Sequence, residues 1–398
     1  MLKDIFFDQV RPAYGCTEPI AVALAVATGK KYLKGELKEA YITLDKNTYK
    51  NGLVVTIPGT HFSGLEIAGA LAYICGNPEL GLEVLKHVDK NCTLEAKKHV
   101  KKFNVSIAKE SPTLSIDVTL KGENTVRVTV KGKHDNIVHI EVEGKQILDK
   151  PFKNNGTLLE KIKQYTLDDI IGYIENPEED VIKHVEKAIE MNLNIAKFGL
   201  ENHNSFSKIA PNNNIKFVEA GIEARMDGAL MPVMTVAGSG NQGLSCILPV
   251  ASEIENFPRI KIIKAVLLSI LTTIYIKAHT GLLTPICGAG VISAAGAAAG
   301  LTYLNNGTKE QIKNAINDTL GTLFGLTCDG AKRGCALKAG TGTFVALQSA
   351  RLALAGINVP CGNGIVAKNV EETIDRVEKL TLSVKQFDND VLDYIGKC

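Results

Sequence analysis

The sequence of 398 residues predicts an α+β protein with a mixed N-terminal half, which contains an antiparallel β subdomain, and an all-α C-terminal half. Between residues 114 and 144, three stretches alternate apolar and polar residues and are separated by turns, which is typical of an antiparallel sheet. Beyond residue 200 the apolar residues recur every three or four positions, and no convincing strand is found. We therefore expect an N-terminal domain over residues 1–199, with its β subdomain at about 93–150, and a C-terminal domain over 200–398.

Local signals predict the elements of the N-terminal half in order. Thr17 is an N-cap candidate with Pro19 close behind it, and Ala and Leu dominate the residues that follow, so a helix is expected there. Glycine and polar residues end each of the segments downstream. The expected helices cover residues 17–34, 65–75, 167–175 and 178–198, and the expected strands before the β subdomain cover residues 41–44 and 54–57.

The C-terminal half is rich in small residues. Residues 278–308 contain no Asp, Glu, Lys or Arg and are dominated by Gly and Ala, which favours a buried helix packed closely on its neighbours. The strongest apolar run, residues 265–276, has 12 residues and is too short to span a bilayer. The expected helices lie near residues 215–226, 243–254, 260–278, 288–304, 308–324, 339–355 and 370–384.

The composition excludes several classes of function. Lys and Arg number 45 and Asp and Glu 43, so the formal net charge is +2 and indicates neither a nucleic acid nor an anionic membrane as a partner. No secretory signal is visible at the N-terminus. We expect a cytoplasmic protein, and a homodimer is a reasonable expectation for it.

Nine cysteines are present, and disulfides are not expected in a large cytoplasmic chain. Cys287 lies at the start of the Gly/Ala-rich helix expected near 288–304, and Cys328 and Cys335 bracket a glycine-containing loop. Glycine loops and helix termini expose N–H groups that can hydrogen-bond a metal thiolate, and the basic residues Lys332 and Arg333 favour the thiolate form. The spacing alone leaves open that all three cysteines are small buried residues.

Four motifs together favour metal ligands over small buried residues: YGCTEPIAVALA, GSGNQG, TPICGAG and CDGAKRGC. They resemble the L-cysteine desulfidase family, which is related to the iron–sulfur L-serine dehydratases. The resemblance covers most of the chain and implies a [4Fe–4S] cluster held by Cys287, Cys328 and Cys335. Three ligands leave one iron open as a Lewis acid, and this iron would bind the sulfur of L-cysteine. The implied reaction is a non-redox β-elimination that gives pyruvate, ammonia and sulfide.

Cys16 follows a glycine and precedes a helix N-terminus, a position that is expected to lower the pKa of its thiol. We expect it to act as an acid or base or to contact the substrate; cluster ligation and a purely structural role are the alternatives. The terminal Cys398 is another candidate for capping the open iron. The general base is not identified by the sequence.

Substrate-binding residues are expected in the GSGNQG segment, next to Cys16 at Thr17, and in the PGTHFSG loop at His61. The GSGNQG segment precedes a helix and offers backbone N–H groups and the Asn241 side chain to a substrate carboxylate. It lacks the residues of a P-loop and follows no convincing strand, so a nucleotide site is disfavoured. The expected substrate-binding residues are Thr17, His61, Gly240, Asn241 and Gln242.

Three other functions compete with a cysteine desulfidase. An iron–sulfur L-serine dehydratase would use the same cluster. A pyridoxal-phosphate lyase would need a Schiff-base lysine, and Lys338 is the one candidate. A non-catalytic redox sensor would have a cluster without a substrate, although electron carriers usually have four cysteine ligands.

Overall fold

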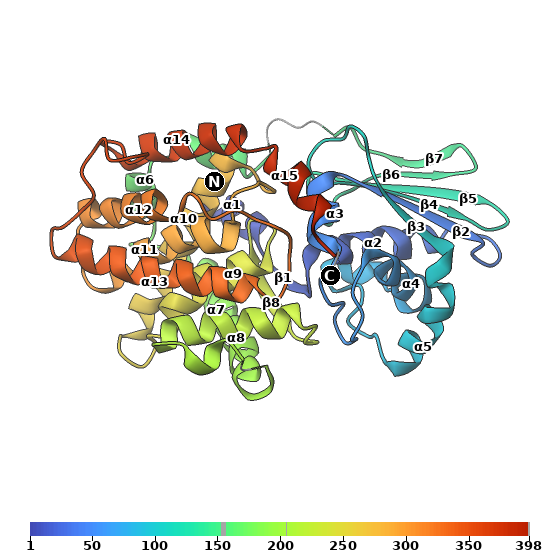
Figure 1. Ribbon diagram of the computed structural model, residues 1–398, viewed down its shortest axis with the longest axis horizontal. Coiled ribbons are helices and arrows are strands. Elements are labelled where there is room, and N and C mark those ends of the chain that lie inside the picture. The colour runs from blue at the N-terminus through green and yellow to red at the C-terminus, as the bar shows by residue number, and fades with distance from the viewer. Residues whose placement is uncertain (153–156, 204, 397–398) are drawn as a thin grey trace.

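The computed structural model describes residues 1–152, 157–203 and 205–396 and has the predicted α+β architecture. It forms two lobes, with the helical lobe on the left of Figure 1 and a β lobe on the right. Each lobe has its own hydrophobic core. Short segments from both ends of the chain lie where the lobes meet, and the candidate site is found there.

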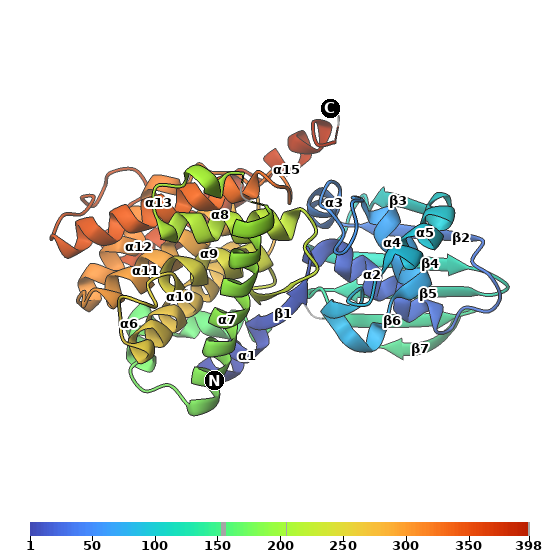
Figure 2. The same ribbon diagram turned by 90° about the horizontal axis from the view of Figure 1, so that it is seen from below.

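The β lobe is a six-stranded sheet covered on one face by helices (Figure 2). Along strand β4 (Ser115–Lys121), alternate residues such as Ile116, Val118 and Leu120 are fully buried, as the period of two predicts. They pack against α2, whose Ala-rich surface is buried on all sides. The strands run in the order β3 (Phe103–Ile107), β2 (Glu39–Leu44), β4 (Ser115–Lys121), β5 (Thr125–Lys131), β6 (Ile137–Val142) and β7 (Lys145–Asp149), and the main helices are α2 (Thr17–Lys30), α3 (Lys46–Gly52), α4 (Leu65–Cys75) and α5 (Lys90–His99).

The helical lobe is built around α11 (Ser293–Leu304), the predicted Gly/Ala-rich helix. It contacts four neighbouring helices, and almost all of its residues are buried. A Cβ atom at Gly296 would lie 2.4 Å from the Ser269 carbonyl oxygen, so only glycine permits this approach of two helices. The other helices are α1 (Leu2–Gln9), α6 (Leu167–Tyr173), α7 (Glu179–Asn202), α8 (Asn213–Met226), α9 (Gly240–Ala251), α10 (Arg259–Thr280), α12 (Lys309–Leu323), α13 (Cys335–Leu354), α14 (Val370–Ser383) and α15 (Phe387–Asp390).

Several expectations were wrong in detail. The C-terminal half contains a strand, β8 (Pro232–Val236), which pairs antiparallel with β1 (Val10–Tyr14), so the half is not all-α and the GSGNQG segment does follow a strand. Because β8 is buried almost throughout, it has no polar–apolar alternation that could reveal it. The expected strand at 54–57 is reduced to an isolated bridge from Thr56 to Ser63. The sheet also contains one parallel pair, β2 with β3.

The chain crosses between the lobes more than once. The expected domain boundary at residue 199 placed α6 and α7 in the N-terminal domain. In the structure these two helices and α1 contribute to the same core as the C-terminal helices. The β-lobe core draws on residues from Ile20 to Ile140. The helical lobe is therefore assembled from both ends of the sequence.

The expectation of no disulfide was also wrong, because Cys75 and Cys92 are joined. Cys75 is the last residue of α4, and Cys92 lies in the first turn of α5. The two helices pack together, which brings the two Cα atoms to 6.0 Å. The bond therefore closes a short segment at the edge of the β lobe.

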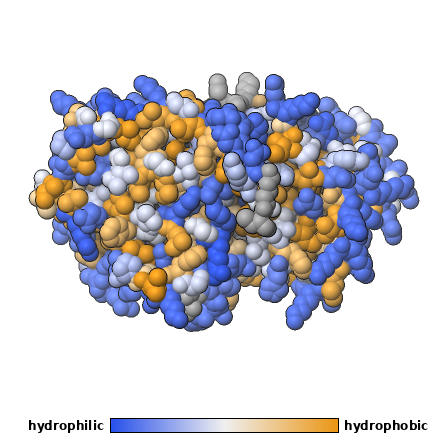
Figure 3. Space-filling view, in the orientation of Figure 1, coloured by the Kyte–Doolittle hydropathy of each residue, from blue (hydrophilic) through white to orange (hydrophobic). Residues whose placement is uncertain are grey.

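None of the helices in the described residues is long and apolar enough to cross a membrane. Figure 3 shows apolar side chains among polar ones on the front of the helical lobe. Exposed large apolar residues include Leu337 and Phe344 of α13. The homodimer stays a prediction.

Candidate active site

A cavity of about 80 Å³ lies between the lobes and is lined by cysteines from distant parts of the sequence. It is lined by Cys16 from the start of α2 and by Cys287, Cys328 and Cys335 from the helical lobe. The sequence analysis assigned a possible function to each of these four cysteines. The other polar residues of its lining are Thr17, Glu18, Asn47, Lys50, Asn51, Thr284, Arg225, Ser239, Asn241, Gln242 and Lys277.

Backbone hydrogen bonds join the segments that carry two of the cysteines. The Cys287 N–H donates to the Leu326 carbonyl oxygen at 2.9 Å, and the Cys328 N–H donates to the Pro285 carbonyl oxygen at 2.6 Å. These bonds form a short antiparallel bridge around Ile286. Cys287 and Cys328, which are 41 positions apart, are thereby held next to each other by the main chain.

Glycines allow the backbone to approach Cys287 closely. A single π-helical turn, Gly288–Ile292, follows this residue, and its Gly290 N–H donates to the Cys287 Sγ at 3.3 Å. A Cβ atom at Gly290 would lie 2.6 Å from the Leu326 side chain and 2.9 Å from the Lys338 carbonyl oxygen. Glycine is thus required at this position for packing, and its N–H is available to stabilise a thiolate.

The third cysteine begins α13, and its Sγ lies 3.6 Å from the Gly330 carbonyl oxygen. Burial, and then the negative charges of Cys328 and Cys335, raise the pKa of Cys287 to about 12, so three adjacent thiolates need a positive group between them. Three thiols around one cavity are a donor set that fits an iron–sulfur cluster.

Basic residues stabilise this loop but do not all face the thiols. Asp329 forms ion pairs with Lys332 and Lys338, and the Lys338 Nζ also donates to the Thr327 carbonyl oxygen at 2.7 Å. Arg333 is turned toward α8, where it pairs with Glu223 at 3.1 Å and Asp227 at 3.4 Å. Lys338 is therefore engaged within the cysteine loop.

Three buried cations that the sequence analysis missed line the cavity: Lys50, Arg225 and Lys277. Lys50 pairs with Asp388 of α15 and donates to the Cys328 carbonyl oxygen at 3.1 Å. Arg225 donates to the Gly15 carbonyl oxygen at 2.6 Å and to the Asn241 side chain at 2.7 Å.

Lys277 is 1% exposed, and burial lowers its pKa to about 8, although the neighbouring thiolates oppose this. A lone Lys at the end of an otherwise apolar helical run was the one sequence signal for it. Since Asp388 neutralises Lys50, Arg225 and Lys277 are the cations that make the cavity a favourable site for an anion.

The structure corrects the expectation for Cys16. This residue, and not Thr17, is the N-cap of α2, and its Sγ donates to Glu18 Oε2 at 3.0 Å. Burial and then the charge of Glu18 raise the pKa of the thiol well above its usual range. The helix terminus does not lower the pKa as predicted, because the loss of solvent and an adjacent carboxylate outweigh it.

The predicted substrate-binding residues divide into two groups. Thr17, Asn241 and Gln242 line the cavity, and the Oε1 of Gln242 is buried without a hydrogen-bond partner. Gly240 lies behind Arg225, where a Cβ atom would be 2.4 Å from the guanidinium Nε. His61 is exposed on the loop before α4 and does not line the cavity. Cys398 lies outside the described residues.

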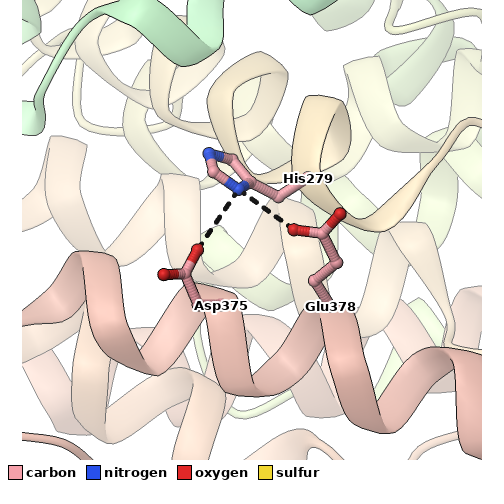
Figure 4. A group of neighbouring side chains, drawn as sticks. All are labelled: His279, Asp375 and Glu378. Carbon is pink, nitrogen blue, oxygen red and sulfur yellow. Dashed lines mark hydrogen bonds and ion pairs between the residues drawn. The ribbon is translucent and has the colours of Figure 1, made fainter.

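His279, close to the end of α10, has carboxylate neighbours on α14 (Figure 4). Its Nδ1 lies 3.3 Å from Glu378 and 3.6 Å from Asp375. Burial lowers the pKa of the imidazole, and the positive charge of Lys163 lowers it further, while the two carboxylates oppose this. The group connects two helices and does not line the cysteine cavity.

Comparisons with known proteins agree with this arrangement. The model of the family described as "Serine dehydratase alpha chain" matches residues 79–393. Proteins named "UPF0597 protein" from Thermosipho africanus and Thermosipho melanesiensis are 64% and 65% identical over the whole length of both chains. Another from Clostridium perfringens is 39% identical and covers 97% of this chain and 95% of its own. This protein therefore belongs to the serine dehydratase alpha chain family, a family of iron–sulfur lyases.

Proposed function

We propose that this protein is an L-cysteine desulfidase, which converts L-cysteine and water to pyruvate, ammonia and hydrogen sulfide. The observation that carries the proposal is the convergence of Cys16 with Cys287, Cys328 and Cys335 on one cavity between the lobes. Cys287, Cys328 and Cys335 would hold a [4Fe–4S] cluster. When bound, the cluster supplies a Lewis-acidic iron that makes the substrate sulfur a better leaving group.

The remaining residues fit an amino-acid substrate. Its α-carboxylate needs a cationic partner in a site with little water, and Lys277 and Arg225 are buried cations of the lining. Arg225 also holds the Asn241 side chain and the carbonyl group of Gly15, so it orients both substrate-binding segments. The unpartnered Gln242 Oε1 is an acceptor for the α-ammonium group.

The reaction is an elimination without net oxidation. A base takes the proton from Cα, the electron pair of that bond forms the Cα=Cβ double bond, and the Cβ–S bond breaks with its electron pair on sulfur. The aminoacrylate product then reacts with water to give pyruvate and ammonia. The chain's own residues bind the carboxylate, orient Cα and exclude water from the broken bond.

Anaerobic purification followed by iron and sulfide analysis tests the proposal. The protein is then assayed for sulfide and pyruvate with L-cysteine and, separately, with L-serine. We expect iron-dependent sulfide release from L-cysteine, and loss of iron in Cys287→Ala, Cys328→Ala and Cys335→Ala. Cys246→Ala is the matched control, because Cys246 is buried in the core and does not line the cavity.

Two results would contradict the proposal. Pyruvate from L-serine, without sulfide from L-cysteine, would identify an L-serine dehydratase with the same site. Iron-free protein with full sulfide release would show that the three cysteines do not serve catalysis through a cluster.

A further inference from the structure

Glu18 is a buried carboxylate whose contacts centre on Cys16. It is 5% exposed and accepts hydrogen bonds from the Cys16 Sγ at 3.0 Å and from the Thr17 hydroxyl at 3.1 Å. Its other oxygen accepts a hydrogen bond from Asn51 Nδ2 at 2.8 Å. The side chain is thus fixed on two sides, and one oxygen remains directed at the thiol.

The charges around this pair favour a carboxylate next to a protonated thiol. Burial by itself raises the pKa of Glu18, but His134, whose Nε2 lies 4.0 Å away, and the hydrogen bonds from Cys16 and Asn51 lower it overall. Burial and Glu18 raise the pKa of Cys16, while Arg225 on α8 opposes them. Lys50 of α3 and Lys277 of α10 are the other cations of the lining.

We propose that Glu18 keeps Cys16 as a protonated thiol, so that Cys16 serves the reaction as a proton donor and Glu18 as its positioning residue. This inference rests on the proposed function. L-cysteine reacts as its thiolate, so the sulfur leaves Cβ as sulfide dianion. Its electron pair takes the proton of Cys16 to give hydrosulfide, and the S–H bond of Cys16 breaks with its electrons left on Cys16. Water then returns a proton to the Cys16 thiolate, so no oxidant or reductant is needed.

The chemistry of the leaving group supports a donor in this place. Sulfide dianion is a stronger base than a cysteine thiolate, so it can take a proton from a donor with a high pKa that has stayed protonated until the sulfide forms. A cysteine that was already a thiolate at neutral pH would have no proton to give. The Arg225 guanidinium is close enough to stabilise the thiolate that remains on Cys16.

The test measures the Cys16 thiol directly in the full-length protein without its cluster. Pulsed alkylation with iodoacetamide is carried out at a series of pH values, and the peptide that contains Cys16 is quantified by mass spectrometry. In the wild type we expect alkylation of Cys16 to begin only well above pH 9. In Glu18→Gln the onset should move to lower pH by about one unit, which is about tenfold more thiolate at a fixed pH.

The same variants are assayed with the cluster bound. In Glu18→Gln the basic limb of kcat/KM against pH should shift to lower pH, because the free enzyme loses its proton donor earlier. Glu18→Asp retains the charge and should restore most of the wild-type limb. Glu219→Gln is the matched control, because Glu219 is a buried carboxylate outside the cavity and its loss should leave both measurements unchanged.

Each outcome decides the inference separately from the proposed function. A wild-type Cys16 that alkylates rapidly near pH 7 would overturn the inference, whatever the variants do. The inference would also be overturned if the wild type releases sulfide but Glu18→Gln changes neither the pH at which Cys16 begins to alkylate nor the basic limb of kcat/KM against pH. That result would leave the desulfidase proposal intact. Absence of sulfide release from the wild type would refute the function, although the thiol measurement would still stand.

Discussion

The buried ion pair between Lys50 and Asp388 connects the β lobe to the C-terminal segment and should be essential for stability. The side chains are 1% and 9% exposed, and Lys50 also holds the carbonyl group of Cys328. Lys50→Met removes one partner and leaves the Asp388 carboxylate buried without a counter-ion. Removal of one partner from a buried pair costs about 3–5 kcal/mol, so we expect the free energy of unfolding to fall by about that amount.

Urea denaturation at pH 7 of the protein without its cluster measures this loss. The double variant Lys50→Met/Asp388→Leu removes both charges and should recover most of the stability, since two apolar groups replace the pair. Lys183→Met is the control, because Lys183 pairs with Glu179 on the exposed surface of α7, and we expect a change of less than about 1 kcal/mol. A loss below about 1 kcal/mol for Lys50→Met, or a double variant as unstable as the single one, would refute the reasoning.

Three further predictions concern other parts of the molecule. Gly290→Ala places a Cβ atom 2.6 Å from the Leu326 side chain, so thermal unfolding should show a destabilisation of about 1–3 kcal/mol and iron analysis a lower iron content. Burial and the charge of Glu223 raise the pKa of Glu219 to about 7 from 4.5. The folded state therefore binds this proton more tightly, and the stability that it contributes, full below pH 4.5, should be lost as the pH rises to about 7. Urea denaturation should show that Glu219→Gln has a shallower decline over this window. Cys75→Ser opens the disulfide to Cys92, which spans 17 positions, and should cost about 3 kcal/mol in urea denaturation without a change in iron content.

The sequence by itself determined most of the secondary structure. The helices at 65–75 and 370–384 and the strands at 115–121 and 125–131 agree with the structure within a residue or two. These elements have a clear period of 3.6 or of two, because one face of each is buried and the other is solvated. The motifs around Cys16, Cys287, Cys328 and Cys335 also identified four residues that the fold brings to one cavity.

The tertiary structure alone decided how the site is charged. Glu18, Lys50, Arg225 and Lys277 come from four different helices, and nothing in their local sequence shows that they converge. Burial reversed the predicted pKa shift of Cys16, since the adjacent carboxylate and the loss of water are properties of packing. The strand β8 was missed because a segment buried almost throughout has no polar face that would reveal its period. The helices α6 and α7 were predicted, but local periodicity does not show which core a helix joins, so their packing with α1 in the helical lobe was not.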